Sequence, residues 1–243
     1  MNLELLNYIF SYFCGKLFDV THTIKIKQGL DIKLKGQAAL SVQCVDSKLF
    51  ALQPTDFIGV LPRLLVQEGD AVEVGTPLFL DKHDERIVFT APVSGRVKEI
   101  RRGEKRLLQA IVIEAAEQEE VASTAPLPLD KDTIRQKLLE TGLWPMIRQR
   151  PYATIARPDD RPKAFFISAF DSSPLAPDMD FVAAHFPESL QKGLEVLSIL
   201  SDNKLHLCLH EKRTQSETLL KATHVERHSF SGPHPSGNVG TQI

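Results

Sequence analysis

The feature that most constrains the fold is a pair of short apolar stretches, each built around a glycine turn. They are Val66–Phe79, which contains Gly69-Asp70, and Phe89–Val97, which contains Ser94-Gly95. Glycine dipeptides of this kind favour tight turns with positive φ, and the flanking residues alternate between apolar and polar with the period of a strand. The stretches predict two similar hairpins packed face to face in a small all-β module over residues 24–116.

Both halves of this module carry a recognisable pattern. EGD-x-V-x-x-G begins at Glu68 and APVSG-x-V begins at Ala91, and together they resemble the biotinyl/lipoyl-like barrel-sandwich hybrid. Carriers of that type hold a modified lysine at the hairpin tip between the halves. Counting back from Ala91 places that tip near Asp84, and the closest lysine, Lys82, lies two positions away. We therefore expect a structural module without a lipoyl or biotinyl arm.

A strand, a charged turn and a second strand follow from Ile100 to Ile113. The basic residues of this hairpin are Arg101, Arg102, Lys105 and Arg106. Such a run is often a solvated hairpin tip. Alternatively, it is a docking patch for an acidic partner or for anionic lipid headgroups.

Charge and cysteine content exclude several classes of protein. The 243 residues contain 29 Lys and Arg against 31 Asp and Glu, so no bulk positive field attracts a nucleic acid. Cys14, Cys44 and Cys208 lie far apart and form no Cys-x-x-Cys. This spacing argues against a disulfide framework, an iron–sulfur cluster or a zinc finger, and it favours a reducing cytoplasm.

Residues 1–23 precede the β module. Their apolar side chains recur at three- and four-residue steps, but charges interrupt them, so neither a transmembrane helix nor a signal peptide is predicted. Two interpretations stay open. The segment is either an amphipathic helix that lies on a membrane surface or a partner, or a non-native extension from an upstream start codon.

Residues 117–129 are acidic and then rich in Ala, Ser, Thr and Pro, which is typical of a linker. Beyond it, Asp130 or Asp132 can cap a helix that Gly142 ends. Trp144 could stack on a ring ligand, but a role as a core anchor is favoured. From residue 164 onward, strand and helix patterns alternate, with strands over 164–169, 204–210 and 224–230 and helices over 188–200 and 216–221. They predict a doubly wound, Rossmann-like α/β domain over residues 130–243.

Ligands of open parallel sheets bind beyond the carboxyl ends of the strands. Three predicted loops follow such ends, and we expect them to form one rim. The candidate ligand residues of this rim are Asp171, Ser172, His210, Lys212, Gly232, His234, Gly237 and Gly240. The glycine loop matches neither G-x-G-x-x-G nor a Walker A sequence, so an ordered turn is an equal alternative.

Several histidines are spaced in ways that could suit metal ligands. His206, Cys208 and His210 share one face of a predicted strand, but burial of the alternating leucines explains the same pattern. His224 and His228 would lie about 13 Å apart on a strand. We therefore predict no metal site, and we assign no catalytic residue.

Taken together, the sequence resembles the A subunit of the sodium-translocating NADH:quinone reductase. The segments that carry this resemblance are IKIKQGLDIKLKG (24–36), FIGVLPRLLVQEGDAVEVGTPLF (57–79), FTAPVSGRVKEIRRGEKRLLQAIVI (89–113), TGLWPMIRQRPY (141–152), AFDSSPLAPD (169–178) and SGPHPSGNVGT (231–241). They run in the order of the family.

The resemblance implies a peripheral subunit on the cytoplasmic side of the bacterial inner membrane. Its enzyme passes electrons from NADH to quinone and couples this to sodium export. The implied role is accessory, in quinone interaction and in assembly of the complex, with no covalent cofactor and no iron–sulfur cluster. Its partners would be the other subunits and quinone, not nucleic acid. A free-standing nucleotide- or flavin-binding oxidoreductase domain is the alternative.

The family begins near Ile24 and continues well past Gly240. The resemblance therefore also implies that this chain is truncated at its C-terminus and that its α/β domain is incomplete.

Overall fold

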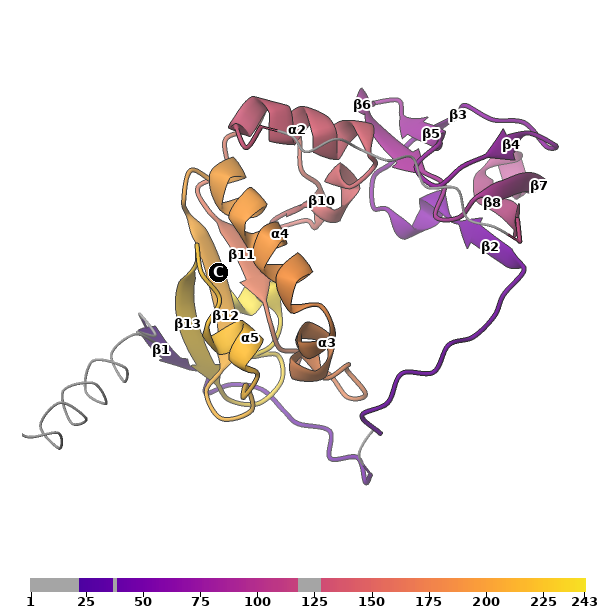
Figure 1. The fold of residues 1–243 in the computed structure, drawn as a ribbon. Helices are drawn as coiled ribbons and strands as arrows, with labels where there is room; N and C mark the ends of the chain where they lie inside the picture. Colours follow the sequence, from indigo (N-terminus) through magenta and orange to yellow (C-terminus); the bar gives the residue numbers. More distant parts are fainter. Residues whose placement is uncertain (1–21, 37–38, 118–127) are drawn as a thin grey trace, which may run out of the picture. The chain divides into compact units, whose positions relative to one another are not determined.

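The computed structural model describes residues 22–36, 39–117 and 128–243. The described chain forms two compact units. One is Val42–Arg161, and the other joins the described residues up to Ser41 with Pro162–Ile243 (Figure 1). Among the described residues, no helix combines the length and the apolar character that crossing a membrane requires.

The first unit contains the predicted β module. Its four-stranded sheet has the order β2-β8-β7-β4, and its three-stranded sheet has the order β3-β5-β6. The strands are β2 (Leu49–Leu52), β3 (Pro62–Leu64), β4 (Ala71–Val72), β5 (Pro77–Asp81), β6 (Asp84–Thr90), β7 (Gly95–Arg102) and β8 (Leu108–Ala115). All pairings within the two sheets are antiparallel. The predicted barrel-sandwich hybrid is confirmed.

The module closes around large apolar side chains from both sheets. Leu78 and Phe79 of β5 and Ile111 and Ile113 of β8 are completely buried. Phe79 also stacks on Phe89, with ring centroids 4.3 Å apart. Removal of this much apolar surface from water is the main favourable contribution to the stability of the module.

The two glycine turns serve different purposes. Gly69 has a φ of 94°, as the sequence predicts. Gly95 does not have a positive φ, so that part of the prediction is wrong. Gly95 is needed because a Cβ there would clash with the carbonyl of Glu114 on the paired strand β8.

The β module also contains the 3-10 turns η1 (Pro54–Asp56) and η2 (Glu104–Arg106). After the module, the first unit continues with helix α2 (Lys131–Glu140), the 3-10 turn η3 (Trp144–Met146) and the paired strands β9 (Arg148–Gln149) and β10 (Thr154–Ile155). Asp130 caps α2 by accepting a hydrogen bond from the Thr133 N–H, and Gly142 follows the helix with a φ of 71°. The Trp144 side chain is buried and its Nε1 donates to the Ala156 carbonyl at 2.7 Å, so Trp144 is a core anchor.

The second unit is an α/β domain with a parallel four-stranded sheet, in the order β1-β13-β12-β11. The strands are β1 (His22–Lys25), β11 (Phe165–Ser168), β12 (Leu205–His210) and β13 (Glu226–Ser231). The helices are α3 (Met179–His185), α4 (Pro187–Leu200), α5 (Glu217–Leu220) and α6 (Val239–Gln242). The predicted α/β architecture is confirmed.

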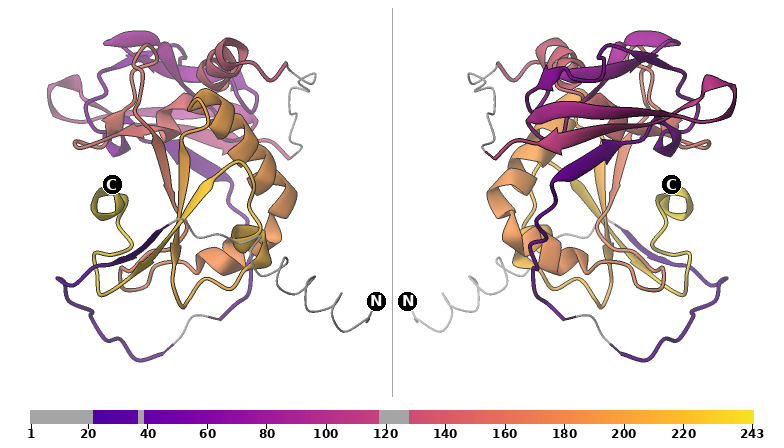
Figure 2. Two further views of the ribbon diagram at one scale, coloured as in Figure 1. Left: turned by 90° about the vertical axis from the view of Figure 1, so that its left-hand side faces the viewer. Right: turned by 90° about the vertical axis from the view of Figure 1, so that its right-hand side faces the viewer.

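The two faces of this sheet differ. Helices α3, α4 and α5 cover one face, where Leu205, Leu207 and Leu209 of β12 join the main apolar cluster (Figure 1). The opposite face carries a smaller cluster around Cys208 and Phe230. Short helix α6 lies on the opposite side of the sheet from α4 (Figure 2).

The compact units differ from the expected segments in two places. Strand β1 pairs with β13, so the chain from His22 adds an edge strand to the α/β sheet instead of the β module. Helix α2 and the residues up to Arg161 belong to the unit of the β module. Of the expected extension 1–23 and linker 117–129, residues 1–21 and 118–127 lie outside the described residues.

Candidate functional site

The loops that follow β11 and β13 meet at the carboxyl end of the sheet. Ser172 Oγ lies 3.0 Å from His234 Nδ1, and the Gly237 N–H donates to Ser172 Oγ at 2.8 Å. These bonds join residues more than 60 positions apart in sequence, as expected for parallel strands whose ends share one edge. Ser172, His234 and Gly237 are therefore brought together as predicted.

The hydrogen bonds define the chemistry of this pair. Because Ser172 Oγ accepts the Gly237 N–H, its own hydrogen is available for His234 Nδ1. With Ser172 Oγ as the donor to Nδ1, the hydrogen of the neutral imidazole lies on Nε2, which has no hydrogen-bond partner among the described residues. His234 and Ser172 are half-buried. The arrangement offers one N–H donor to a ligand that carries a hydrogen-bond acceptor.

Asp171 adds a negative charge next to this pair. The backbone N–H of Ser173 donates to its carboxylate at 2.7 Å. This hydrogen bond is the main reason why the pKa of Asp171 is lowered, and the nearby His234 lowers it further, against the effect of partial burial. Asp171 is therefore ionised at neutral pH and places a negative charge beside the Ser172–His234 pair.

A third segment of the rim comes from residues that the sequence assigned to the β module. The His234 N–H donates to Asp31 Oδ1 at 2.9 Å, and the Leu30 N–H donates to the His234 carbonyl at 3.0 Å. The Ile26 N–H also bonds to the Ser231 carbonyl at 2.8 Å. The segment after β1 thus fastens the loop after β13. The motif IKIKQGLD is visible in the sequence, but nothing in it points to a partner about 200 residues away.

The glycines of the rim serve close packing of the chain on itself. A Cβ on Gly237 would clash with the backbone at Ser172, and one on Gly232 would clash with the Ile26 carbonyl. Gly240 lies in α6 and is exposed. The sequence left two interpretations open for the glycine-rich loop after β13, a ligand-binding rim and an ordered turn. The structure favours the ordered turn.

His210 and Lys212 have a different role. His210 Nδ1 accepts hydrogen bonds from the backbone N–H groups of Lys212 and Arg213, both at 3.1 Å, so it holds the turn after β12. Burial, followed by the charge of Arg213, lowers the pKa of His210. No hydrogen bond joins either residue to Ser172 or His234 among the described contacts. The side chain of His210 is therefore a turn cap, and Lys212 is exposed beside it.

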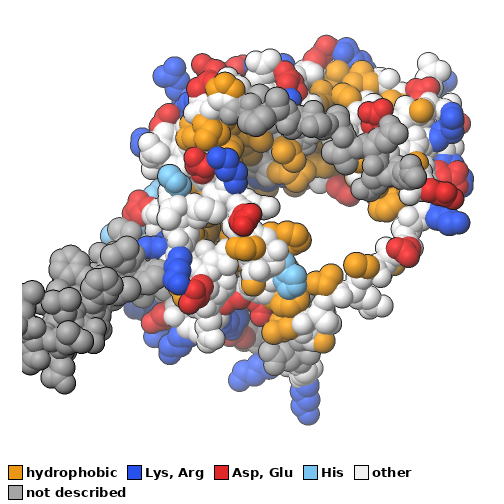
Figure 3. All heavy atoms as spheres, in the orientation of Figure 1, with side chains coloured by type: hydrophobic (Ala, Val, Ile, Leu, Met, Phe, Trp, Pro, Cys, Tyr) orange, Lys and Arg blue, Asp and Glu red, His pale blue; other side chains and the backbone are white. Residues whose placement is uncertain are grey.

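The basic hairpin of the β module is exposed. Arg101, Arg102, Lys105 and Arg106 all face solvent around η2, and Lys105 and Arg106 have positive φ values of 52° and 61°. Arg101 Nε contacts Glu99 Oε2 at 3.0 Å. Elsewhere, on the face shown in Figure 3, acidic and basic side chains are interspersed.

The hairpin tip between the halves of the module lies at Lys82-His83. Asp81 pairs with Asp84, so counting back to Asp84 gives the wrong position. The register of β5 and β6 is irregular between Pro77 and Phe79 and between Leu80 and Asp81, which a residue count does not reveal. Lys82 is exposed at this turn. The position of the tip therefore no longer argues against an acyl arm on Lys82. The absence of such an arm stays a prediction.

Both parts of the chain match models of known domain families. Residues 24–116 match the model of the NqrA N-terminal barrel-sandwich hybrid domain, and residues 129–243 match the model of the NqrA second alpha/beta domain. The chain belongs to the NqrA family. Curated relatives carry the name of the A subunit of the Na(+)-translocating NADH-quinone reductase.

These NqrA relatives include proteins from Yersinia pseudotuberculosis, 40% identical over 228 residues, and Neisseria meningitidis serogroup A, 38% identical over 229 residues. A third, from Neisseria gonorrhoeae, is 36% identical over 229 residues. Each alignment covers 90% of this chain and 50% of the relative. The chain spans about half the length of these relatives.

The structure also brings together three residues of this NqrA-family chain that the sequence did not connect. His206 of β12 lies beside Glu226 and His228 of β13. The sequence grouped His206 with Cys208 and His210 along one strand, and His228 with His224. Both groupings missed the contact across strands, because strand pairing cannot be read from a single sequence.

Proposed function

We propose that the chain is a peripheral, cytoplasm-facing accessory subunit of a membrane reductase that passes electrons from NADH to quinone and exports sodium. Membership of the NqrA family supports this role. The observation that supports docking is the basic hairpin, which presents four exposed cations at the end of the paired strands β7 and β8. An acidic surface on another subunit is its complement.

Docking is tested by co-purification of the 243-residue chain with the other subunits. The test variant reverses the charge of Arg101, Arg102, Lys105 and Arg106 to Glu. The control reverses four exposed cations elsewhere, so that the net charge changes equally: Arg150, Arg161, Lys163 and Lys204. We expect the hairpin variant to bind at least about tenfold more weakly than the control. Equal binding of the two variants would remove the hairpin from the interface.

The rim at Ser172 and His234 is the proposed point of contact with quinone. A quinone carbonyl is a hydrogen-bond acceptor, and His234 Nε2 is a half-buried donor. Titration with a short-chain ubiquinone analogue, followed by thermal shift, tests this role. We expect His234→Phe to abolish the shift and His83→Phe, in the other unit, to preserve it. A quinone response that His234→Phe leaves intact would exclude the rim.

The same titration addresses a free-standing oxidoreductase. FMN and NADH should leave the melting temperature unchanged, and the purified protein should be colourless. A clear thermal shift with either nucleotide, or a yellow preparation, would favour the alternative function.

We also propose that the module carries no lipoyl or biotinyl arm. The lysine at the hairpin tip, Lys82, stands between Asp81 and His83. The intact mass should equal the mass calculated from the sequence. An acyl increment that Lys82→Arg removes would contradict the proposal.

A further inference from the structure

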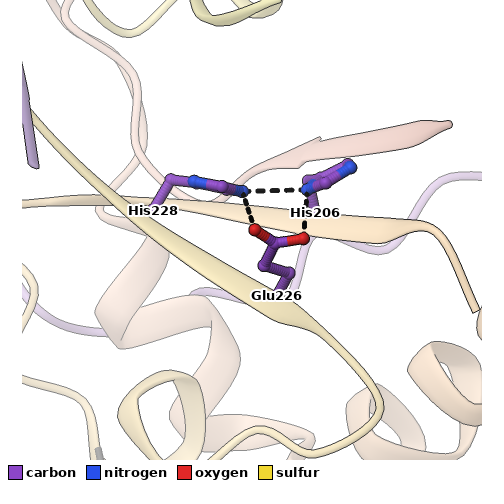
Figure 4. Close-up of side chains that lie close together, drawn as sticks. All are labelled: His206, Glu226 and His228. Atoms are coloured by element: carbon purple, nitrogen blue, oxygen red, sulfur yellow. Dashed lines mark hydrogen bonds and ion pairs between the residues drawn. The ribbon is translucent and has the colours of Figure 1, made fainter. Parts of the chain in front are cut away.

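Three potential metal ligands meet on the face of the α/β sheet opposite α3, α4 and α5. His206 of β12 pairs with Glu226 of β13, and His228 follows Glu226 by two residues, so all three side chains share one face. Figure 4 shows the two imidazole rings and the carboxylate pointing toward a common centre. Neither the rim nor the basic hairpin includes these residues.

The distances suit a single small cation. His206 Nδ1 lies 2.8 Å from His228 Nε2 and 3.4 Å from Glu226 Oε2, and His228 Nε2 lies 3.8 Å from Glu226 Oε1. In a tetrahedral zinc site with bonds of about 2.0–2.1 Å, neighbouring ligand atoms are about 3.3 Å apart. With one ligand atom taken from each residue, the three atoms lie within 4.8 Å of one another, a separation that small side-chain rotations bring to this spacing.

The short distance between the two nitrogens shows that the imidazoles already face each other. Two imidazole lone pairs repel each other at 2.8 Å, so without a cation one nitrogen donates a hydrogen to the other, and a bound cation would replace this hydrogen. The carboxylate of Glu226 on the same side adds negative charge, which favours a divalent cation over a neutral hydrogen bond.

Neighbouring rings hold both imidazoles in place. Phe166 stacks on His206 with centroids 4.7 Å apart, and His22 of β1 lies parallel to His228 with centroids 5.7 Å apart. The side chains of His206 and His228 are 19% and 11% exposed, whereas that of Glu226 is 44% exposed. The two imidazoles are thus held in place by packing, whereas the carboxylate faces solvent. This exposure leaves a fourth coordination position for water.

We propose that His206, Glu226 and His228 form a binding site for a divalent first-row metal ion, best represented by Zn²⁺. Two imidazole nitrogens and one carboxylate oxygen are a ligand set that zinc accepts with an open fourth position. The neighbouring Cys208 is not a ligand, because it is completely buried and burial raises the pKa of its thiol to about 12.

The test uses the untagged 243-residue chain after treatment with EDTA. Zn²⁺ is titrated in competition with a chromophoric chelator, and Co²⁺ reports the coordination geometry through its visible absorption. We expect one equivalent of Zn²⁺ and a tetrahedral Co²⁺ spectrum. His206→Gln, Glu226→Gln and His228→Gln should each weaken Zn²⁺ binding at least about tenfold and abolish the Co²⁺ bands.

His83→Gln is the matched control, because it removes one histidine from the other unit and should not change binding. Glu226→Gln keeps the test decisive if a histidine variant fails to fold, since Glu226 is partly exposed and its replacement is nearly isosteric. Absence of stoichiometric Zn²⁺ binding, or equal binding by the wild-type chain and Glu226→Gln, would overturn the proposal. The cluster would then be a hydrogen-bonded pair of histidines.

Discussion

The β module and the α/β domain bury different kinds of side chain. In β8 of the module, Ala110, Ile111, Val112 and Ile113 are all buried and all apolar. In β12 of the α/β domain, leucines alternate with His206, Cys208 and His210, and the face of these residues is also mostly buried. The comparison teaches that burial alone does not define an apolar core. The face of the parallel sheet opposite α3, α4 and α5 keeps titratable groups out of solvent.

The largest expected effect that tests this comparison is slow labelling of the Cys208 thiol. At neutral pH, a thiol with a pKa of about 12 carries roughly one thousandth of the thiolate of an ordinary cysteine. Cys44 is exposed, and Cys14 lies outside the described residues. In a variant with both replaced by Ser, labelling of Cys208 by a thiol reagent should be about a thousandfold slower in the folded protein than in urea. Rapid labelling without denaturant would show that this face is open.

Phe79 tests the apolar side of the comparison. It is completely buried and stacks on Phe89, so Phe79→Ala leaves a large cavity between the two sheets. We expect a loss of about 3–5 kcal/mol in the free energy of unfolding of the β module, measured by urea denaturation. His206→Gln should cost the α/β domain much less. Similar losses for both variants would remove the distinction between the two interiors.

A substitution at Gly237 tests how closely the rim of the α/β domain is packed. Gly237→Ala places a methyl group against the backbone at Ser172 and should destabilise the α/β domain by about 1–3 kcal/mol. The control is Gly193→Ala in α4, where nothing lies within 4 Å of the new Cβ. That change should stabilise the same domain by up to about 1 kcal/mol, because alanine favours a helix. Opposite signs in thermal denaturation would confirm that packing requires Gly237.

The smallest effect concerns the surface of the β-module unit. Hydrogen bonds from Arg86 lower the pKa of Asp84 and of Asp159. Because these pKa values are lower in the folded state, the stabilisation is present above the ordinary carboxyl pKa and is lost as the pH falls through the folded-state values. Arg86→Gln should therefore lower the melting temperature slightly at pH 7, and the difference should shrink as the pH falls below the ordinary carboxyl pKa. A difference that stays constant with pH would contradict this origin.

Local patterns predicted most elements of the second unit. The sequence placed a strand over 164–169, a helix over 188–200 and a strand over 204–210, and the structure has β11, α4 and β12 there. These predictions rest on apolar periodicity, which neighbouring residues determine. Strand β1 was missed because an exposed four-residue edge strand carries little periodicity.

The candidate site was predictable only in part. Ser172 and His234 were expected to meet because the carboxyl ends of parallel strands share one edge. The hydrogen bond between His234 and Asp31 depends on β1 pairing with β13, which no local signal indicates. The hairpin tip at Lys82 was misplaced for a related reason, since irregularities in strand register are invisible in a residue count.

The sequence determined the family, the two classes of domain and the basic hairpin, because motifs and periodicity are properties of neighbouring residues. The tertiary structure decided which strands pair, and with them the approach of His206 to Glu226 and His228. It also decided that Gly232 and Gly237 pack against the chain itself. These contacts join distant segments, and their geometry follows from strand order and register, which a linear pattern does not encode.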